Sequence, residues 1–84
     1  MNVTFSARAW SQYLEWQDTD RKVLKKLNAL IKECQRTPFT GMGKPEPLKG
    51  ELSGAWSRRI DQEHRLVYRA TKSGLEIVQC RYHY

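Results

Sequence analysis

The sequence predicts an α+β fold, in which an antiparallel sheet carries an N-terminal helical hairpin packed on one face. Two observations lead to this class. The first part of the chain has apolar residues at helical spacing, whereas after Gly54 they alternate with a period of two. Helices followed by a run of strands are typical of α+β proteins. A chain of 84 residues has room for one hydrophobic core, so we expect a single domain over residues 1–84.

The N-terminal segment is predicted to form a short strand and a first helix. Residues 2–5 alternate as a strand does, and Ser6 can cap a helix over about 7–17. The apolar stripe of this helix, at spacings of three and four residues, is made by Trp10, Tyr13 and Leu14. Because tryptophans in such patterns usually pack inside, we expect core positions for Trp10, Trp16 and Trp56.

A second and stronger helix follows directly. Thr19 or Asp20 caps it, and its pattern continues to about Gln35. Its apolar stripe comprises Val23, Leu24, Leu27, Leu30, Ile31 and Cys34, while Lys22, Lys25, Lys26 and Lys32 line its other faces. The short break between the two helices predicts a helical hairpin.

A loop rich in glycine, proline and lysine leads out of the second helix. Pro38 ends that helix, because proline disfavours helical conformation in the residue before it. The loop runs to Gly50, and such long connections are usually functional or disordered. Pro45 and Pro47 flank Glu46 and hold it in a stiff, extended backbone. We therefore expect the loop to position this glutamate.

Three strands are predicted after the loop, over residues 55–60, 65–71 and 75–81. Their connections, 61–64 and 72–74, are short, so the strands should pair antiparallel as a meander. The helical hairpin then covers one face of the sheet. The other face is expected to be free for function.

Composition narrows the classes of function. A net charge of +6 and a pI near 9.6 favour a polyanionic partner, nucleic acid before membrane. Cys34 and Cys80 are too few for a disulfide scaffold and lack the CxxC or His/Cys clusters of metal sites, so we expect free thiols and neither metal nor cofactor. No charged leader with an apolar core and no apolar run of about 20 residues is present, which predicts a cytoplasmic protein without a membrane partner.

Cleavage of RNA without a metal needs a base for the 2′-hydroxyl, an acid for the leaving 5′-oxygen and cations for the phosphate. Glu46 is the candidate base, in a basic loop between Lys44 and Lys49. The alternative for an isolated loop glutamate is a solvated surface charge. His83 is the candidate acid, since imidazole carries a proton near neutral pH, and Tyr84 offers a ring for base stacking.

The arginines are candidate phosphate ligands because guanidinium groups bind phosphate oxygens in pairs. Strand alternation places Arg58 and Arg59 on opposite faces. We favour Arg59, because Arg58 shares parity with Trp56 and Ile60, which look core-facing. The face of Arg65 depends on the strand register, which the sequence leaves open.

The chain end continues an apolar strand, so the tail 81–84 should be pinned to the sheet instead of frayed. His64 falls in a predicted turn, where it is expected to orient neighbouring groups.

Four sequence blocks with their spacing resemble the YoeB branch of the RelE-like toxin family. The blocks are Gly43–Lys49 (GKPEPLK), Trp56–Ile60 (WSRRI), Glu63–Tyr68 (EHRLVY) and Cys80–Tyr84 (CRYHY). The helical part agrees less specifically, so the resemblance covers nearly the whole chain. It implies a fold similar to microbial ribonucleases and cleavage of messenger RNA in the ribosomal A site, without a metal.

The resemblance also implies residue roles and partners. The implied roles are general base for Glu46, general acid for His83, transition-state stabiliser for Arg65, phosphate ligands for Lys49 and Arg59, and stacking on or positioning of the scissile nucleotide for Tyr84. Lys44, in the same loop as Glu46, is a further candidate phosphate ligand. A cognate antitoxin is implied as protein partner, and self-association as a homodimer is a further option.

Two other functions remain open on the residues alone. A non-catalytic RNA- or ribosome-binding module would share the charge and the aromatic residues, but it has no use for a fixed Glu46. A protein-interaction component would use the basic surface to hold an acidic partner and would cleave no RNA.

Overall fold

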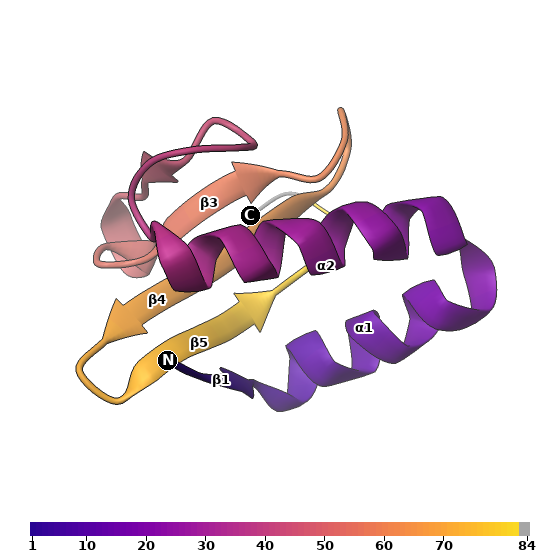
Figure 1. The fold of residues 1–84 in the computed structure, drawn as a ribbon, viewed down its shortest axis with the longest axis horizontal. Helices are drawn as coiled ribbons and strands as arrows, with labels where there is room; N and C mark the ends of the chain where they lie inside the picture. Colours follow the sequence, from indigo (N-terminus) through magenta and orange to yellow (C-terminus); the bar gives the residue numbers. More distant parts are fainter. Residues whose placement is uncertain (83–84) are drawn as a thin grey trace.

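In the computed structural model, which describes residues 1–82, two helices pack on one face of a five-stranded sheet (Figure 1). In chain order the elements are β1 (Asn2–Phe5), α1 (Ala7–Thr19), α2 (Arg21–Arg36), β2 (Glu46–Pro47), the 3-10 helix η1 (Gly50–Leu52), β3 (Trp56–Arg59), β4 (Arg65–Thr71) and β5 (Gly74–Gln79). The predicted α+β class is confirmed. Within residues 1–82, no helix is long and apolar enough to cross a membrane.

The helical hairpin is confirmed, and its tight connection depends on one residue. The Asp20 N–H donates to the carbonyl of Trp16 and closes α1. Its carboxylate accepts from the N–H groups of Lys22 and Val23, so the same residue caps α2. Of the two predicted caps Asp20 is therefore the one used. Ser6 caps α1 as expected.

The sheet has the strand order β1-β5-β4-β3-β2. The predicted antiparallel meander of β3, β4 and β5 is confirmed, and β2 extends it antiparallel at one edge. At the other edge β1 pairs parallel with β5, so the complete sheet is mixed. This pairing needs glycine at position 74, where a Cβ would lie 2.3 Å from the Asn2 carbonyl oxygen.

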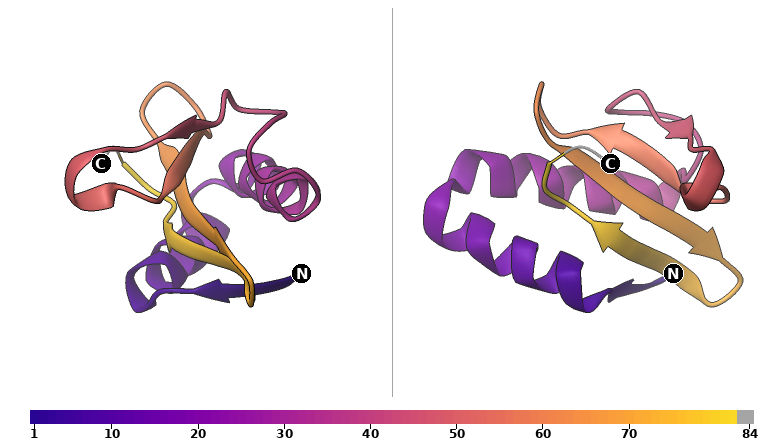
Figure 2. Two further views of the ribbon diagram at one scale, coloured as in Figure 1. Left: turned by 90° about the vertical axis from the view of Figure 1, so that its left-hand side faces the viewer. Right: turned by 180° about the vertical axis from the view of Figure 1, so that it is seen from behind.

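The main core lies between the helices and the sheet. Its largest contributions come from Trp16, Leu27, Leu30, Leu66, Tyr68, Leu75 and Ile77. A second, smaller core lies on the opposite face, where Leu48 and Ala55 pack on Val67. Figure 2 (left) shows α2 and the η1 segment on opposite sides of the strands. The second face is therefore only partly free, contrary to expectation, because the connection from β2 to β3 folds back over it.

The expected core position of Trp10 is wrong. Its side chain is 48% exposed, and Leu14 is 42% exposed. The residues of α1 that reach the core are Ala9 and Trp16, with Tyr13 packed between them at the same helical stripe. The stripe that faces the sheet therefore shares Tyr13 with the predicted one but contains Ala9 and Trp16 in place of Trp10 and Leu14. The reason is that α1 lies at the β1–β5 edge and presents part of its apolar surface outward.

Candidate active site

The strand register brings three predicted site residues onto one face of the sheet. Arg59 of β3 lies directly opposite Arg65 of β4, and Glu46 of β2 lies opposite Ser57 of β3. Directly opposed residues of an antiparallel pair share a face, and Ser57 shares its face with Arg59 by alternation. Glu46, Arg59 and Arg65 therefore belong to the face turned away from the helices. The face of Arg65, open in the sequence, is settled by this register.

Arg58 points the other way, as its parity predicted, and it is fully buried. Its guanidinium donates to the Tyr68 hydroxyl at 3.0 Å and to the carbonyl oxygens of Met42 at 3.0 Å and Thr40 at 2.9 Å. It also donates to the Thr37 carbonyl. Arg58 thus ties the loop after α2 to the sheet. The sequence pattern placed Arg58 in the core but did not predict this role, because its acceptors in the loop are backbone carbonyls, which residue types do not reveal.

The loop reaches β3 through a second backbone contact. The Arg59 N–H donates to the Gly43 carbonyl at 2.7 Å, and β2 then pairs with β3. Glu46 is exposed on this short edge strand, as are Lys44 before it and Lys49 just before η1. The loop therefore does position Glu46, and it does so against the strand that carries Arg59.

The Arg65 side chain closes the turn between β3 and β4. Its Nη1 donates to the Asp61 carbonyl at 2.7 Å. A guanidinium has five N–H donors, so this bond leaves capacity for phosphate. Within the same turn, the Asp61 carboxylate accepts N–H groups of Glu63 at 2.9 Å and His64 at 2.7 Å. Burial raises the pKa of Asp61, but the N–H groups of His64 and Glu63 outweigh it, and the pKa lies below its ordinary value.

The end of the described chain is fastened to this turn. The Tyr82 N–H donates to Nδ1 of His64 at 2.7 Å, and the Tyr82 carbonyl accepts the N–H of Arg65 at 3.1 Å. The His64 ring is 8% exposed and packs edge-on against Trp16, with ring centroids 4.8 Å apart. His64 therefore orients its neighbours, as expected from its place in the turn. Tyr82 adopts a positive φ of 65° there.

The predicted acid His83 and the predicted stacking residue Tyr84 lie outside the described residues. The predicted third strand stops early, since β5 ends at Gln79. Beyond it the Arg81 guanidinium lies 4.9 Å from the ring centroid of Tyr82 and pairs with the carboxylate of Glu15. Up to residue 82, the tail is thus held by α1 and by the β3–β4 turn more than by strand pairing.

The cysteines do not contribute to the site. Both are free and buried, as predicted. Burial raises the pKa of Cys34 to about 11 and that of Cys80 to about 12, so neither forms a thiolate at neutral pH. Among residues 1–82, no group of three or more His, Cys, Asp or Glu side chains is arranged to hold a metal ion.

Comparison with known proteins shows the family of this chain. The family model of the YoeB-like toxin of bacterial type II toxin–antitoxin systems matches residues 5–84. The chain belongs to this family. The YoeB toxin of Streptomyces coelicolor is 58% identical over 84 residues, which cover all of both chains. These matches confirm that the four sequence blocks of this YoeB-family toxin resemble the YoeB branch.

Solved structures of YoeB relatives have the same fold. The YoeB/ParE toxin from Agrobacterium tumefaciens matches with a TM-score of 0.96 and 52% identity over all of both chains. The YoeB of Staphylococcus aureus, solved in a YoeB–YefM complex, matches with a TM-score of 0.92 and 45% identity over 100% of this chain and 98% of its own. The same relative has also been solved as a dimer, with a TM-score of 0.93, 46% identity and the same coverage.

Proposed function

We propose that this YoeB-family toxin is an endoribonuclease that cleaves messenger RNA by general acid–base catalysis without a metal ion. The observation that supports it most is the shared face of Glu46, Arg59 and Arg65 on three successive strands. Tyr82 is bonded to Arg65 beside them, and His83 follows it in the chain. In this proposal the base Glu46 and the two cations act from the shared face, and His83 is assigned as the proton donor by its place in the sequence after Tyr82.

In the proposed reaction Glu46 takes the proton from the 2′-hydroxyl of the scissile nucleotide. The 2′-oxygen forms a bond to the adjacent phosphorus, and the bond from phosphorus to the 5′-oxygen breaks. His83 gives its proton to that leaving oxygen. Arg65 and Arg59 donate hydrogen bonds to the phosphoryl oxygens, whose charge grows in the transition state. The products are a 2′,3′-cyclic phosphate and a 5′-hydroxyl.

The remaining predicted residues bind the substrate. Lys44 and Lys49 neutralise phosphates along the loop, and Tyr84 stacks on the base of the scissile nucleotide. Base–aromatic stacking contributes about 1–3 kcal/mol per base. The net charge of +6 attracts the RNA over a longer range and makes its binding depend on salt.

The proposed setting is the cytoplasm, with messenger RNA in the ribosomal A site as substrate. The proposed regulator is a cognate antitoxin, supported by the YoeB–YefM complex of the Staphylococcus aureus relative. The dimer of that relative supports self-association as a further state. Residues 1–84 together form the one functional domain that carries out the proposed reaction.

The deciding experiment is RNA cleavage in a translating extract, comparing the parent with Glu46→Ala and His83→Ala. We expect cleavage by the parent and a loss of at least about 100-fold in each variant, the lower range of general acid–base effects. An assay of purified RNA in EDTA then tests the absence of a metal requirement. Inhibition of translation by the parent without cleaved RNA would instead identify a non-catalytic ribosome-binding module.

A further inference from the structure

A cavity of about 360 Å3 lies beside the proposed catalytic face, between α2, the loop before β2 and the turn after β3. Its lining includes Lys26, Gly43, Lys44, Arg59, Ile60 and Asp61. Sites for small ligands have volumes of about 300–1,000 Å3, so this cavity has room for one small molecule or one unit of a polymer.

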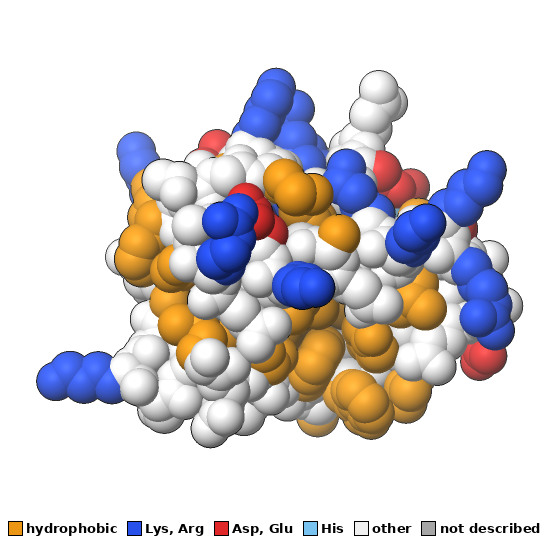
Figure 3. All heavy atoms as spheres, in the orientation of Figure 1, with side chains coloured by type: hydrophobic (Ala, Val, Ile, Leu, Met, Phe, Trp, Pro, Cys, Tyr) orange, Lys and Arg blue, Asp and Glu red, His pale blue; other side chains and the backbone are white. Residues whose placement is uncertain are grey.

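The charge around this cavity favours an anion. Lys26 comes from α2, Lys44 from the loop and Arg59 from β3, so three separate elements each contribute a cation. The one carboxylate in the lining, Asp61, already accepts two backbone N–H groups from its own turn. In Figure 3, Lys and Arg side chains lie spread over the region of α2.

The buried part of the cavity lining is apolar and belongs to the main core. Ile60 is 4% exposed, and it is packed in the main core. Gly43 lies flat against that core, where a Cβ would come within 3.0 Å of a Leu30 methyl carbon. The lysine side chains add aliphatic stems beneath their charged ends. An apolar floor with a cationic rim fits a base or ribose on the surface and its phosphate at the rim.

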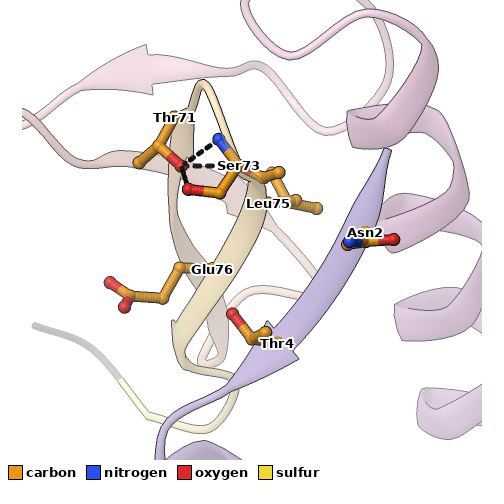
Figure 4. A pocket seen from close by; sticks show the side chains of 7 residues that line it. Asn2, Thr4, Thr71, Ser73, Leu75 and Glu76 are labelled. Atoms are coloured by element: carbon orange, nitrogen blue, oxygen red, sulfur yellow. Dashed lines mark hydrogen bonds between the residues drawn. The ribbon is translucent and has the colours of Figure 1, made fainter.

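Another cavity of similar size differs in this respect. It measures about 340 Å3 and lies at the edge formed by β1 and β5 (Figure 4). The described residues that line it are mostly polar, together with Gly74 and Leu75, and include Glu76 but no lysine or arginine. Size therefore does not distinguish the two cavities, but charge does.

The cationic cavity shares Arg59 with the proposed site of cleavage. Arg59 lines the cavity, and it lies opposite Arg65 across the β3–β4 pair. We propose that the cavity binds a nucleotide of the substrate RNA adjacent to the scissile one, with Lys26 and Lys44 as ligands of its phosphate. This assignment rests on the proposed ribonuclease function and gives Lys26 a role in substrate binding.

The test is binding of RNA that cannot be cut. A fully 2′-O-methylated hexanucleotide lacks the attacking hydroxyl, and a 2′-O-methylated dinucleotide without terminal phosphates has only the phosphate between its two nucleosides, so it offers no second phosphate to the cavity. Fluorescence anisotropy compares the parent with Lys26→Ala and with Lys32→Ala, a control at another exposed lysine of α2. We expect Lys26→Ala to weaken hexanucleotide binding roughly three- to tenfold. Its slope of log affinity against log salt should fall by about 0.7, the value for one contact to a single-stranded phosphate.

The controls distinguish binding in the cavity from general electrostatic attraction between a basic protein and RNA. We expect Lys32→Ala to bind the hexanucleotide like the parent, and the dinucleotide to bind the parent and Lys26→Ala equally. Equal losses in the two variants would overturn the proposal, because any surface lysine would then suffice. Unchanged hexanucleotide binding by Lys26→Ala would overturn it as well.

The same proteins are assayed in parallel for cleavage of unmodified RNA. A parent that cleaves, together with unaltered binding by Lys26→Ala, would leave the ribonuclease proposal standing and remove only the cavity's role. A parent that binds in a Lys26-dependent way without cleaving would support the nucleotide site and contradict the ribonuclease function.

Discussion

The backbone N–H of Tyr82 donates a hydrogen bond to Nδ1 of His64 across 2.7 Å. In this bond Nδ1 of the His64 imidazole is the acceptor. The ring is almost buried against Trp16, which fixes its orientation. The path of the chain end beside Arg65 thus depends on one nitrogen of a residue that the proposed reaction does not use directly.

Replacing His64 should therefore impair catalysis by altering the position of Tyr82 beside Arg65. We expect His64→Phe, which keeps a ring but loses the acceptor, to lower kcat by about tenfold or more, with KM little changed, since misplaced catalytic groups are costly. His64→Asn should recover part of the loss because its amide oxygen can replace Nδ1. Steady-state kinetics on one RNA substrate measures both variants. Parent-like kcat in His64→Phe would show that the tail does not need this bond.

Substitutions of the neighbouring residues Arg58 and Arg59 should have different effects, one on stability and the other on RNA cleavage. Arg58→Met removes the donors for Tyr68 and three loop carbonyls from a buried site, which should lower the free energy of unfolding by about 3 kcal/mol or more. Arg59→Met should leave the urea midpoint near that of the parent and reduce RNA cleavage. Urea denaturation and cleavage assays on both variants check this. Equal stability of the two would contradict the structural role of Arg58.

Alkaline pH should destabilise the fold through its buried thiols. Burial raises the pKa of Cys34 to about 11 and of Cys80 to about 12, above the value of about 8.5 for a free thiol. The folded state therefore holds these protons more tightly than the unfolded chain. Their contribution to stability is complete below about pH 8.5 and declines as the pH rises towards 11 and 12. Urea midpoints at pH 7, 9 and 10 should fall in that order, and less steeply in a Cys34→Ala variant.

The ends of the cleaved RNA test the chemistry assigned to Glu46. Attack by the 2′-hydroxyl leaves a 2′,3′-cyclic phosphate, or the phosphate formed when it opens, and a 5′-hydroxyl on the other fragment. Mass spectrometry of the fragments distinguishes these ends. A substrate with deoxyribose at the scissile nucleotide should resist cleavage and serves as the control. Fragments with a 3′-hydroxyl would exclude Glu46 as the base for a 2′-hydroxyl.

The local signals of the sequence located both helices and the strands β1, β3, β4 and β5, whereas β2 and η1 were not predicted. Ser6 and Asp20 begin the helices at the expected residues, since a cap acts on N–H groups only two or three positions away. Alternation likewise separated buried Arg58 from exposed Arg59, because neighbouring residues of a strand face opposite sides. The Pro-flanked loop and the chemistry of arginine made Glu46 and Arg65 candidate site residues, and the family resemblance gave each a proposed role.

Other features were decided only when distant segments met. The face of Arg65 follows from its pairing with Arg59, and the parallel place of β1 follows from its pairing with β5. The second small core and the outward position of Trp10 depend on which surfaces the finished sheet leaves uncovered. Local conformation is set by a residue and its near neighbours, and the sequence determined it. Register and burial are set by contacts between residues far apart in the chain, and the tertiary structure decided them.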